Sequence, residues 1–344
     1  MKKILVTGGL GYIGSHVVVE LIKNEFEVII IDDLSNSNLN VLDGIYNITG
    51  VKPIFEKIDL KKKLSLCDFF SQYYDINGVI HFAASKAVGE SVNNPLRYYE
   101  NNIHSLIYLI QEISKLPTQK LIFSSSCTVY GQADKLPITE NARIKEPESP
   151  YGNSKKVGEQ IIIDTTKANR LFNAVALRYF NPIGAHESAL IGELPIGIPQ
   201  NLVPFVTQTG IGLRDKLSIF GNDYPTPDGT CIRDYIHVVD LAKAHVVAMK
   251  RLLEEKNIEN FEVFNIGTGK GSSVLEVVKT FEEVSNTKLN YSFVDRRPGD
   301  IVSAYADTTK AKEILGWKSE LSLREAILSA WNWEKHIHQH KSKS

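Results

Sequence analysis

Apolar runs of strand length alternate with amphipathic stretches of helical length through the first half of the chain. Residues rich in β-branched side chains predict buried strands at 4–6, 28–31, 79–82, 120–124 and 174–178. Segments with one apolar face lie between several of them, among them 15–24 and 98–114. Strands that alternate with helices predict an α/β fold with a doubly wound parallel sheet of the Rossmann type.

The pattern changes after about residue 181. Residues 182–230 are rich in glycine and proline and have little periodicity, which predicts loops and short elements. A helical stretch at 239–253 and a strand-like run at 261–266 are candidates to return to the sheet, and 325–338 is expected to be helical. We therefore predict a Rossmann-type domain over residues 1–180, with returning segments around 235–270, and a smaller C-terminal α/β domain that occupies most of 181–344.

Composition narrows the class of protein. Of the 344 residues, 43% are hydrophobic and 23% charged, so the chain has ample material for a globular core. The formal net charge of -1 gives no reason to expect a nucleic acid or an anionic membrane as a partner. Three widely spaced cysteines without a C-x-x-C pair argue against a disulfide framework and a structural zinc site, and no metal is expected. The apolar runs are too short for a spanning helix or a signal-peptide core, so the cytoplasm is the expected location.

Three glycines, Gly8, Gly11 and Gly14, follow the first predicted strand and open the first predicted helix. Their spacing lets the backbone turn tightly, so that a pyrophosphate can approach the N–H groups at the helix N-terminus. Asp32 ends the next predicted strand, where a carboxylate accepts hydrogen bonds from an adenosine ribose and repels a 2′-phosphate. The combination predicts a dinucleotide site that prefers NAD to NADP.

Two further acidic positions leave alternatives open. Asp33 is either a second ribose ligand or a surface charge. Asp59, followed by Leu60, closes another strand-like run, and its carboxylate either meets the adenine amino group or lies on an exposed loop.

Tyr151 and Lys155 lie four residues apart on a predicted helix at 150–164, so their side chains share one face. A free tyrosine has a pKa of about 10 and is a poor base at neutral pH. A nearby ammonium, together with the positive nicotinamide ring of NAD, would lower that pKa, and the tyrosine could then take the proton of a sugar hydroxyl as hydride leaves its carbon. Ser126 stands at the carboxyl end of a predicted strand, where ligands of open parallel sheets bind, and is placed to relay that proton.

Longer runs of residues carry a resemblance to a known family. The glycine turn, the strand end SCTVYG at 126–131 and the Y-x-x-x-K pair resemble the extended short-chain dehydrogenase/reductase superfamily. The runs that narrow the resemblance to UDP-glucose 4-epimerases are HFAASKAVGES at 81–91, RYFNPIGAH at 178–186, FGNDYPT at 220–226, RDYIHV at 233–238 and RRPGD at 296–300. The resemblance extends over essentially the whole chain.

The resemblance implies an isomerase that interconverts UDP-galactose and UDP-glucose through a transient 4-keto sugar, with tightly bound NAD in the first domain and the UDP-sugar mainly in the second. It implies that Tyr151 is the base, that Lys155 holds the nicotinamide ribose, and that Ser126 assists proton transfer. The residues implied for NAD are Gly8, Gly11, Tyr12, Ile13, Gly14, Asp32, Asp59, Leu60, Phe82, Ala83, Lys86, Asn101, Tyr151, Lys155 and Phe180. Those implied for the UDP-sugar are Ser126, Tyr151, Asn181, Asn201, Leu202, Phe220, Arg233, Arg297, Asp300 and Ala304. The resemblance also implies a homodimer.

Ala304 bears on sugar specificity. Some members of the resembled family carry a bulky tyrosine at this position, whereas members with a small residue also accept N-acetylated sugars. Because a packed interior rejects extra volume, the alanine suggests that UDP-GalNAc and UDP-GlcNAc are substrates too. The alternative is an alanine with no bearing on specificity. Arg233 and Arg297 suit a diphosphate, since guanidinium groups match phosphate oxygens, although each could instead pair with a neighbouring aspartate.

Three rival functions share parts of this pattern. A nucleotide-sugar 4,6-dehydratase needs a carboxylate at the serine strand end, where this chain has Ser126-Cys127-Thr128. An ordinary dehydrogenase would release NADH. An NAD-sensing regulator would not need Tyr151, Lys155 and Ser126 together.

Overall fold

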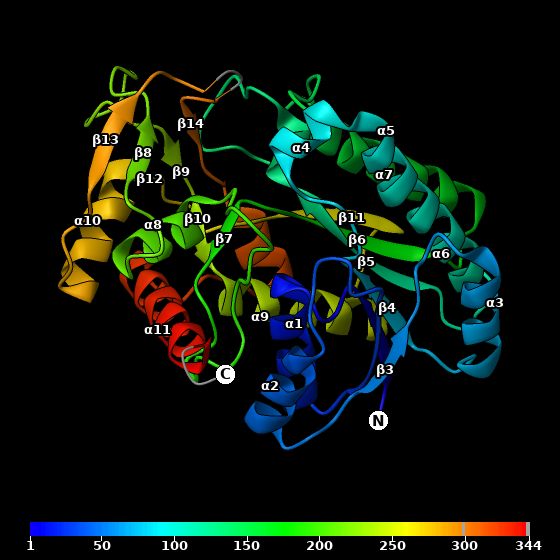
Figure 1. Ribbon diagram of the computed structural model, residues 1–344. Coiled ribbons are helices and arrows are strands. Elements are labelled where there is room, and N and C mark those ends of the chain that lie inside the picture. The colour runs from blue at the N-terminus through cyan, green and yellow to red at the C-terminus, as the bar shows by residue number, and fades with distance from the viewer. Residues whose placement is uncertain (298–299, 342–344) are drawn as a thin grey trace.

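A seven-stranded parallel sheet forms the centre of the larger lobe in the computed structural model, which describes residues 1–297 and 300–341 (Figure 1). The strand order is β11-β6-β5-β4-β1-β2-β3, and neighbouring strands pair in parallel. In chain order the strands are β1 (Lys3–Thr7), β2 (Glu27–Asp32), β3 (Ile54–Lys57), β4 (Gly78–His81), β5 (Lys120–Ser126), β6 (Asn173–Tyr179) and β11 (Phe261–Ile266). This is the doubly wound, Rossmann-type α/β sheet that the sequence predicts.

Helices cover both faces of the sheet, because successive strand residues point to opposite sides. Ile4 and Val6 pack with α1 (Tyr12–Lys23), α2 (Asn40–Thr49) and α9 (Val238–Leu253) on one face. Leu5, between them, packs with helices on the other face, namely α3 (Lys63–Gln72), α6 (Ser105–Ile113) and α7 (Pro150–Ala168). The two apolar layers fix the sheet, and with it the loops that follow the carboxyl ends of its strands.

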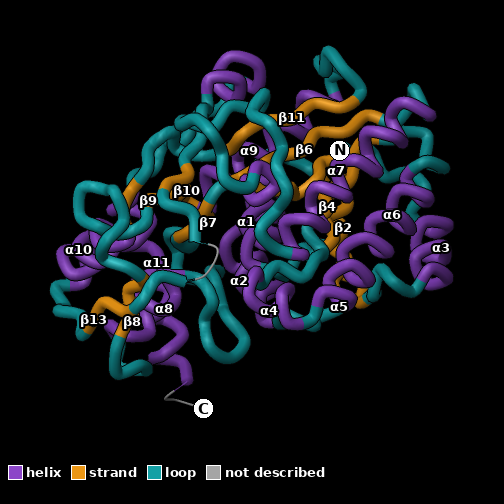
Figure 2. Tube along the Cα trace, turned by 90° about the horizontal axis from the view of Figure 1, so that it is seen from above, coloured by secondary structure: helices purple, strands orange, loops and turns teal. Residues whose placement is uncertain are grey.

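A smaller lobe lies to one side of the main sheet and contains α8, α10 and α11 (Figure 2). Its helices are α8 (Leu202–Gly210), α10 (Val274–Ser285) and α11 (Leu323–Lys341). Its short strands form three small sheets from β8 (Leu217–Phe220) and β13 (Tyr291–Val294), from β7 (Asn181–Ile183) and β10 (Tyr235–His237), and from β9 (Ile232–Arg233), β12 (Ser272–Ser273) and β14 (Ser303–Ala304). A separate apolar cluster that includes Val206, Phe281 and Trp331 holds this lobe together.

The structure confirms the five strands predicted from apolar runs and the helices predicted at 15–24, 150–164, 239–253 and 325–338. The prediction of one regular helix at 98–114 is wrong in one respect. After the short α4 (Val88–Asn93), the structure has α5 (Pro95–Tyr99), a π-helical turn at Glu100–His104 and then α6. A π turn inserts one residue into the helical repeat, which turns Asn101 and Asn102 toward the loop after β4. Within the part of the chain that the structure describes, we find no helix long and apolar enough to cross a bilayer.

Candidate active site

The glycine turn between β1 and α1 needs residues without side chains at Gly8 and Gly14. Gly8 has φ +70, and a Cβ there would lie 2.8 Å from the backbone nitrogen of Ala83. A Cβ on Gly14 would lie 2.2 Å from the Gly8 carbonyl oxygen. Gly11 precedes α1 with extended backbone angles, so the first-turn N–H groups of α1, including those of Tyr12 and Ile13, point out of the turn. The turn therefore leaves a bare, partly positive surface of the kind that binds a pyrophosphate.

Asp32 ends β2 beside this turn and is buried. Its Oδ2 accepts a hydrogen bond from the Leu10 backbone N–H at 3.1 Å, and its Oδ1 accepts from the Leu34 N–H at 2.9 Å and the Ser37 hydroxyl at 2.7 Å. The carboxylate thus links the glycine turn to the loop after β2. Asp33 instead accepts hydrogen bonds from Ser35 in a local turn.

The loops after β3 and β4 carry the remaining candidates for the cofactor. Asp59 is half-buried and accepts a hydrogen bond from the Lys61 N–H at 3.0 Å, while the next residue, Leu60, is buried. Phe82 and Ala83 directly follow β4, and Lys86 comes three residues later. The π turn fixes this second loop, because the Asn101 amide donates to the Ser85 hydroxyl at 3.1 Å.

Asn102, which the sequence reasoning missed, is the stronger link. Its Oδ1 accepts from the Ser85 N–H at 2.8 Å, and its amide nitrogen donates to the Ser85 carbonyl at 3.0 Å and to the Ser154 hydroxyl at 2.9 Å. Asn102 thereby joins the loop after β4 to α7, the helix that carries Tyr151 and Lys155.

The sheet and α7 bring Ser126, Tyr151 and Lys155 together. Ser126 is the last residue of β5, and its hydroxyl accepts hydrogen bonds from the Thr128 N–H at 3.2 Å and the Thr128 hydroxyl at 3.0 Å. The α7 helix begins with Pro150 at its first position, and the Ser149 side chain caps it by accepting from the Gly152 N–H at 3.2 Å.

Lys155 is buried under Tyr151 on the same face of α7. Its Nζ donates to the Ser124 carbonyl oxygen at 2.7 Å and lies 5.9 Å from the centroid of the Tyr151 ring. A charged ammonium therefore sits directly beneath the phenol at the carboxyl end of the sheet.

Burial dominates the titration of this pair. Burial raises the pKa of Tyr151 to about 12, against a smaller lowering by the hydrogen bond with Ser126. Burial also lowers the pKa of Lys155 to about 8, although the charge of Glu159 acts in the opposite direction. The lowered tyrosine pKa expected from the sequence is therefore not a property of the protein alone, and it depends on the positive charge that a bound nicotinamide would add.

A buried ion pair between α7 and β6 was also missed by the sequence reasoning. Glu159, one turn after Lys155 on α7, accepts from the Arg178 Nε at 2.8 Å, and the Arg178 Nη2 lies 2.5 Å from its other oxygen. The Ser125 hydroxyl donates to Glu159, and the Arg178 Nη1 donates to the Tyr130 hydroxyl at 3.0 Å. These contacts tie α7 to β5 and β6, the two strands that lie under Tyr151.

Apart from Ser126 and Tyr151, the candidates for the nucleotide sugar belong to the smaller lobe. Asn181 begins β7, directly after the buried cofactor candidate Phe180, and Asn201 and Leu202 stand at the start of α8. The Phe220 ring at the end of β8 lies 4.2 Å from the guanidinium carbon of Arg297, an arrangement that gives a flat stacking surface beside a cation.

Arg233 and Asp300 contact each other next to Ala304. The Arg233 Nη2 lies 3.4 Å from the Asp300 Oδ1, the ion pair that the sequence left open for this arginine. Ala304 is opposite Arg233 in the β9–β14 pairing and belongs to the same apolar cluster as Phe180. Of the RRPGD run, Pro298 and Gly299 lie outside the described residues.

Among residues 1–297 and 300–341 no group of three or more His, Cys, Asp or Glu side chains is arranged to hold a metal ion.

Comparison with known proteins identifies the family. The family model described as GDP-mannose 4,6 dehydratase matches residues 5–329. The chain is 48% identical to the UDP-glucose 4-epimerase of Haemophilus influenzae over 332 residues, which cover 96% of this chain and 97% of that protein. The chain belongs to the UDP-glucose 4-epimerase family. The family model is described as a dehydratase, whereas the relatives that are 48% identical to this chain are named UDP-glucose 4-epimerase.

Solved UDP-glucose 4-epimerases have the same fold. The enzyme from Stenotrophomonas maltophila, with bound NAD and formylated UDP-arabinopyranose, superposes with a TM-score of 0.95 at 42% identity and covers 99% of this chain and 100% of that chain. The enzyme from Bifidobacterium longum, in complex with NAD+ and UDP, superposes with a TM-score of 0.93 at 44% identity and covers 97% of this chain and 98% of that chain.

Proposed function

We propose that this chain is an NAD-dependent epimerase that interconverts UDP-galactose and UDP-glucose. The observation that carries the proposal is the pairing of Tyr151 with the buried Lys155 beside Ser126, at the carboxyl end of a sheet whose glycine turn fits a dinucleotide. Family membership and the NAD and UDP ligands of the similar structures support it.

The protein's own part in the reaction is to hold the sugar and to move one proton. Tyr151 takes the proton of the 4-hydroxyl group, with Ser126 as the relay, and later returns it to the 4-keto sugar. Lys155 supplies a fixed positive charge under the phenol, where it stabilises the phenolate. The glycine turn, Asp32 and the loops after β3 and β4 would hold NAD, whose chemistry there would be reversible hydride transfer at C4. Inversion requires that the keto sugar presents its other face before the hydride returns.

The binding of the UDP part keeps that intermediate from escaping. We assign this role to the side chains of the smaller lobe, with Phe220 and Arg297 beside the uridine and Arg233 and Asp300 beside the diphosphate and sugar. In this proposal residues 1–180, with the segments around 235–270, form the NAD-binding domain, and 181–344 form mainly the UDP-sugar-binding domain. The family resemblance also favours a homodimer and a cytoplasmic location, and light scattering of the purified protein tests the first.

Proton NMR of UDP-galactose with purified protein and no added nicotinamide tests the proposal. We expect UDP-glucose to appear and the two sugars to reach a fixed ratio. Tyr151→Phe is the matched variant, and its kcat should fall at least about 100-fold because only the proton-transferring hydroxyl is removed. Net formation of NADH would instead indicate a dehydrogenase, loss of water from the sugar would indicate a dehydratase, and full function in Tyr151→Phe would indicate a sensor.

We also propose that UDP-GalNAc and UDP-GlcNAc are substrates. Ala304 is small, lies beside Arg233 and packs in the same cluster as Phe180, so an acetamido group meets little volume at this wall. If the purified protein converts UDP-galactose but leaves UDP-GalNAc unchanged, this part of the proposal is wrong.

A further inference from the structure

Glu193 lies where the two candidate binding regions meet. It stands on the loop of residues 184–201 between β7 and α8, and its side chain is only 11% exposed. Its Oε1 accepts a hydrogen bond from the Asn201 amide nitrogen at 2.6 Å and also lies 3.2 Å from the Lys86 Nζ. Lys86 comes from the loop after β4, on the cofactor side. A single carboxylate oxygen therefore joins a side chain assigned to NAD to one assigned to the UDP-sugar.

Asn201 donates to Glu193 and, within the described residues, does not form the helix-capping hydrogen bond that is usual at its position. It is the residue before the first turn of α8, with extended backbone angles of φ -91 and ψ 149. Asparagine is favoured at that position because its side chain accepts a hydrogen bond from the helix backbone. In the described structure the Asn201 side chain makes no such cap and donates to Glu193 instead. The bond from the Asn201 Nδ2 to the carboxylate thus fixes the amide in an orientation in which its oxygen does not cap α8.

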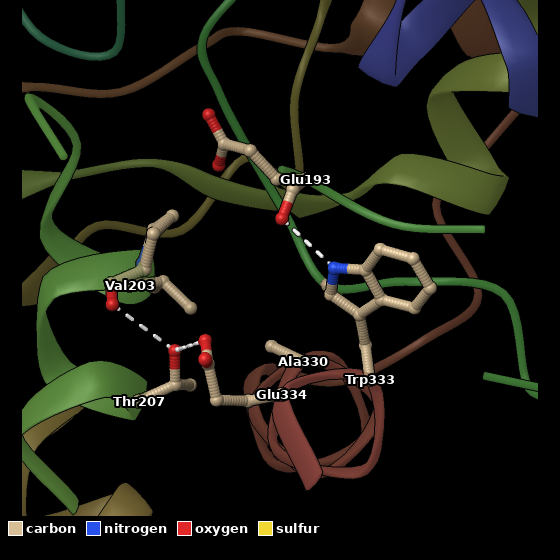
Figure 3. Close-up of a pocket in the computed structure, with 8 residues that line it drawn as sticks. Glu193, Val203, Thr207, Ala330, Trp333 and Glu334 are labelled. Atoms are coloured by element: carbon tan, nitrogen blue, oxygen red, sulfur yellow. Dashed lines mark hydrogen bonds between the residues drawn. The ribbon is translucent and has the colours of Figure 1, made fainter. Parts of the chain in front are cut away.

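The backbone of Glu193 is itself fixed by α11. Its carbonyl oxygen accepts from the Trp333 Nε1 at 2.8 Å, and a Cβ on Gly192 would lie 2.5 Å from the Trp333 ring. Figure 3 shows the consequence: the carbonyl points to Trp333, whereas the carboxylate points away from it. The pKa of Tyr12, at the start of α1, is raised mainly by burial, and the negative charge of the nearby Glu193 carboxylate raises it further.

A carboxylate is unfavourable at this place, because both ligands of the proposed function carry a negatively charged diphosphate. Like charges repel, and the Lys86 ammonium offsets only part of that repulsion. A neutral side chain would avoid the cost if the loop needed only shape. The retained charge is explained if it orders Asn201 and Lys86, since Lys86 is 47% exposed and would otherwise sample many conformations.

We propose that Glu193 is a positioning residue, which holds the Asn201 amide and the Lys86 ammonium in place for the nucleotide sugar and the cofactor. The inference rests on the proposed function, because it concerns the same two binding regions. Without the carboxylate, Asn201 returns to the cap of α8 and Lys86 moves into solvent. The chemical step, which belongs to Tyr151 and Ser126, remains intact.

The test compares Glu193→Ala and Glu193→Gln with Glu187→Ala, an exposed residue on the same loop that serves as control. We expect Glu193→Ala to raise KM for UDP-galactose about tenfold, and the Kd for UDP in calorimetry by a similar factor, with kcat within about threefold of the parent. Glu193→Gln keeps an oxygen that accepts from Asn201, so its KM should stay within about threefold. Glu187→Ala should match the parent.

A double-variant cycle separates positioning from a general effect on the loop. In an Asn201→Ala background, Glu193→Ala should raise KM less than about twofold further, because its main effect acts through the missing amide. Full additivity, an unchanged KM in Glu193→Ala, or a fall in kcat alone would overturn the inference. If thermal unfolding shows that Glu193→Ala is not folded, Glu193→Asp replaces it in the test, because the shorter side chain withdraws the carboxylate by one methylene. Glu193→Asp should give an intermediate rise in KM, and an unchanged KM would again overturn the inference. Failure of the parent to convert UDP-galactose would reject the proposed function, whereas the UDP calorimetry would still decide the role of Glu193.

Discussion

Replacing Glu159 by alanine leaves the Arg178 guanidinium buried without its carboxylate. The side chains of Glu159 and Arg178 are 3% and 5% exposed, so the guanidinium has almost no contact with bulk water that could replace the lost partner. The guanidinium would lose its contacts from Nε at 2.8 Å and from Nη2 at 2.5 Å, and would keep only the Tyr130 hydroxyl at 3.0 Å among these hydrogen bonds. Removal of one partner of a buried pair costs about 3–5 kcal/mol, and we expect that loss in the free energy of unfolding.

Urea unfolding of the parent and of Glu159→Ala measures this loss. Two further variants test its cause. Glu159→Gln retains one acceptor oxygen and should be less destabilised than Glu159→Ala. The double variant Glu159→Leu, Arg178→Met buries no charge, so it should be more stable than Glu159→Ala alone, even though two side chains have been changed. A loss below about 1 kcal/mol in Glu159→Ala, or a double variant less stable than the single one, would refute the reasoning.

Three other predictions follow from the site. Burial lowers the pKa of Lys155 to about 8, so between pH 8 and 10 the unfolded chain binds more protons than the NAD-free folded one. The free energy of unfolding should therefore rise with pH over this range by about 2 kcal/mol in the parent relative to Lys155→Met, and a pH-independent difference in urea unfolding would contradict this. Gly14→Ala places a Cβ 2.2 Å from the Gly8 carbonyl, so the purified variant should lose its bound NAD, seen as a changed ratio of absorbance at the nucleotide and protein maxima; full retention would count against the turn as the cofactor site. Ala304→Tyr should lower kcat/KM for UDP-GalNAc at least about tenfold more than for UDP-galactose, and equal effects would remove Ala304 from the specificity argument.

Local patterns explain what the sequence could predict. The strand at 28–31 and residues 174–177 of the strand at 174–178 are continuous apolar runs because helices cover both faces of the sheet, and such runs are visible without any tertiary information. The glycine turn and the Tyr151–Lys155 pair were equally accessible, because their geometry depends on residues within one turn of each other.

Contacts between segments that are distant along the chain could not be predicted, because no local pattern in the sequence marks them. The π turn at Glu100–His104 could not be recognised from the sequence, because the apolar pattern continues on both sides of it and one inserted residue leaves the periodicity almost unchanged. Glu193 and Lys86 are 107 residues apart, on loops whose approach depends on both lobes. The burial that raises the pKa of Tyr151 in the absence of NAD could not be estimated from the spacing of two residues on a helix.

Because β11 forms the edge of the main sheet, the two lobes cannot be separated by one cut in the chain. The chain leaves the sheet after β6, forms β7, α8 and other parts of the smaller lobe, and then comes back through α9 to lay β11 against β6. A fragment that stops near residue 180 would leave the pairing edge of β6 open and would uncover Val175 and Leu177, which pack with α9 residues such as Leu241. Neither lobe is a module that can be exchanged between relatives by a single crossover, and a chimaera has to transfer residues 238–266 together with the N-terminal half.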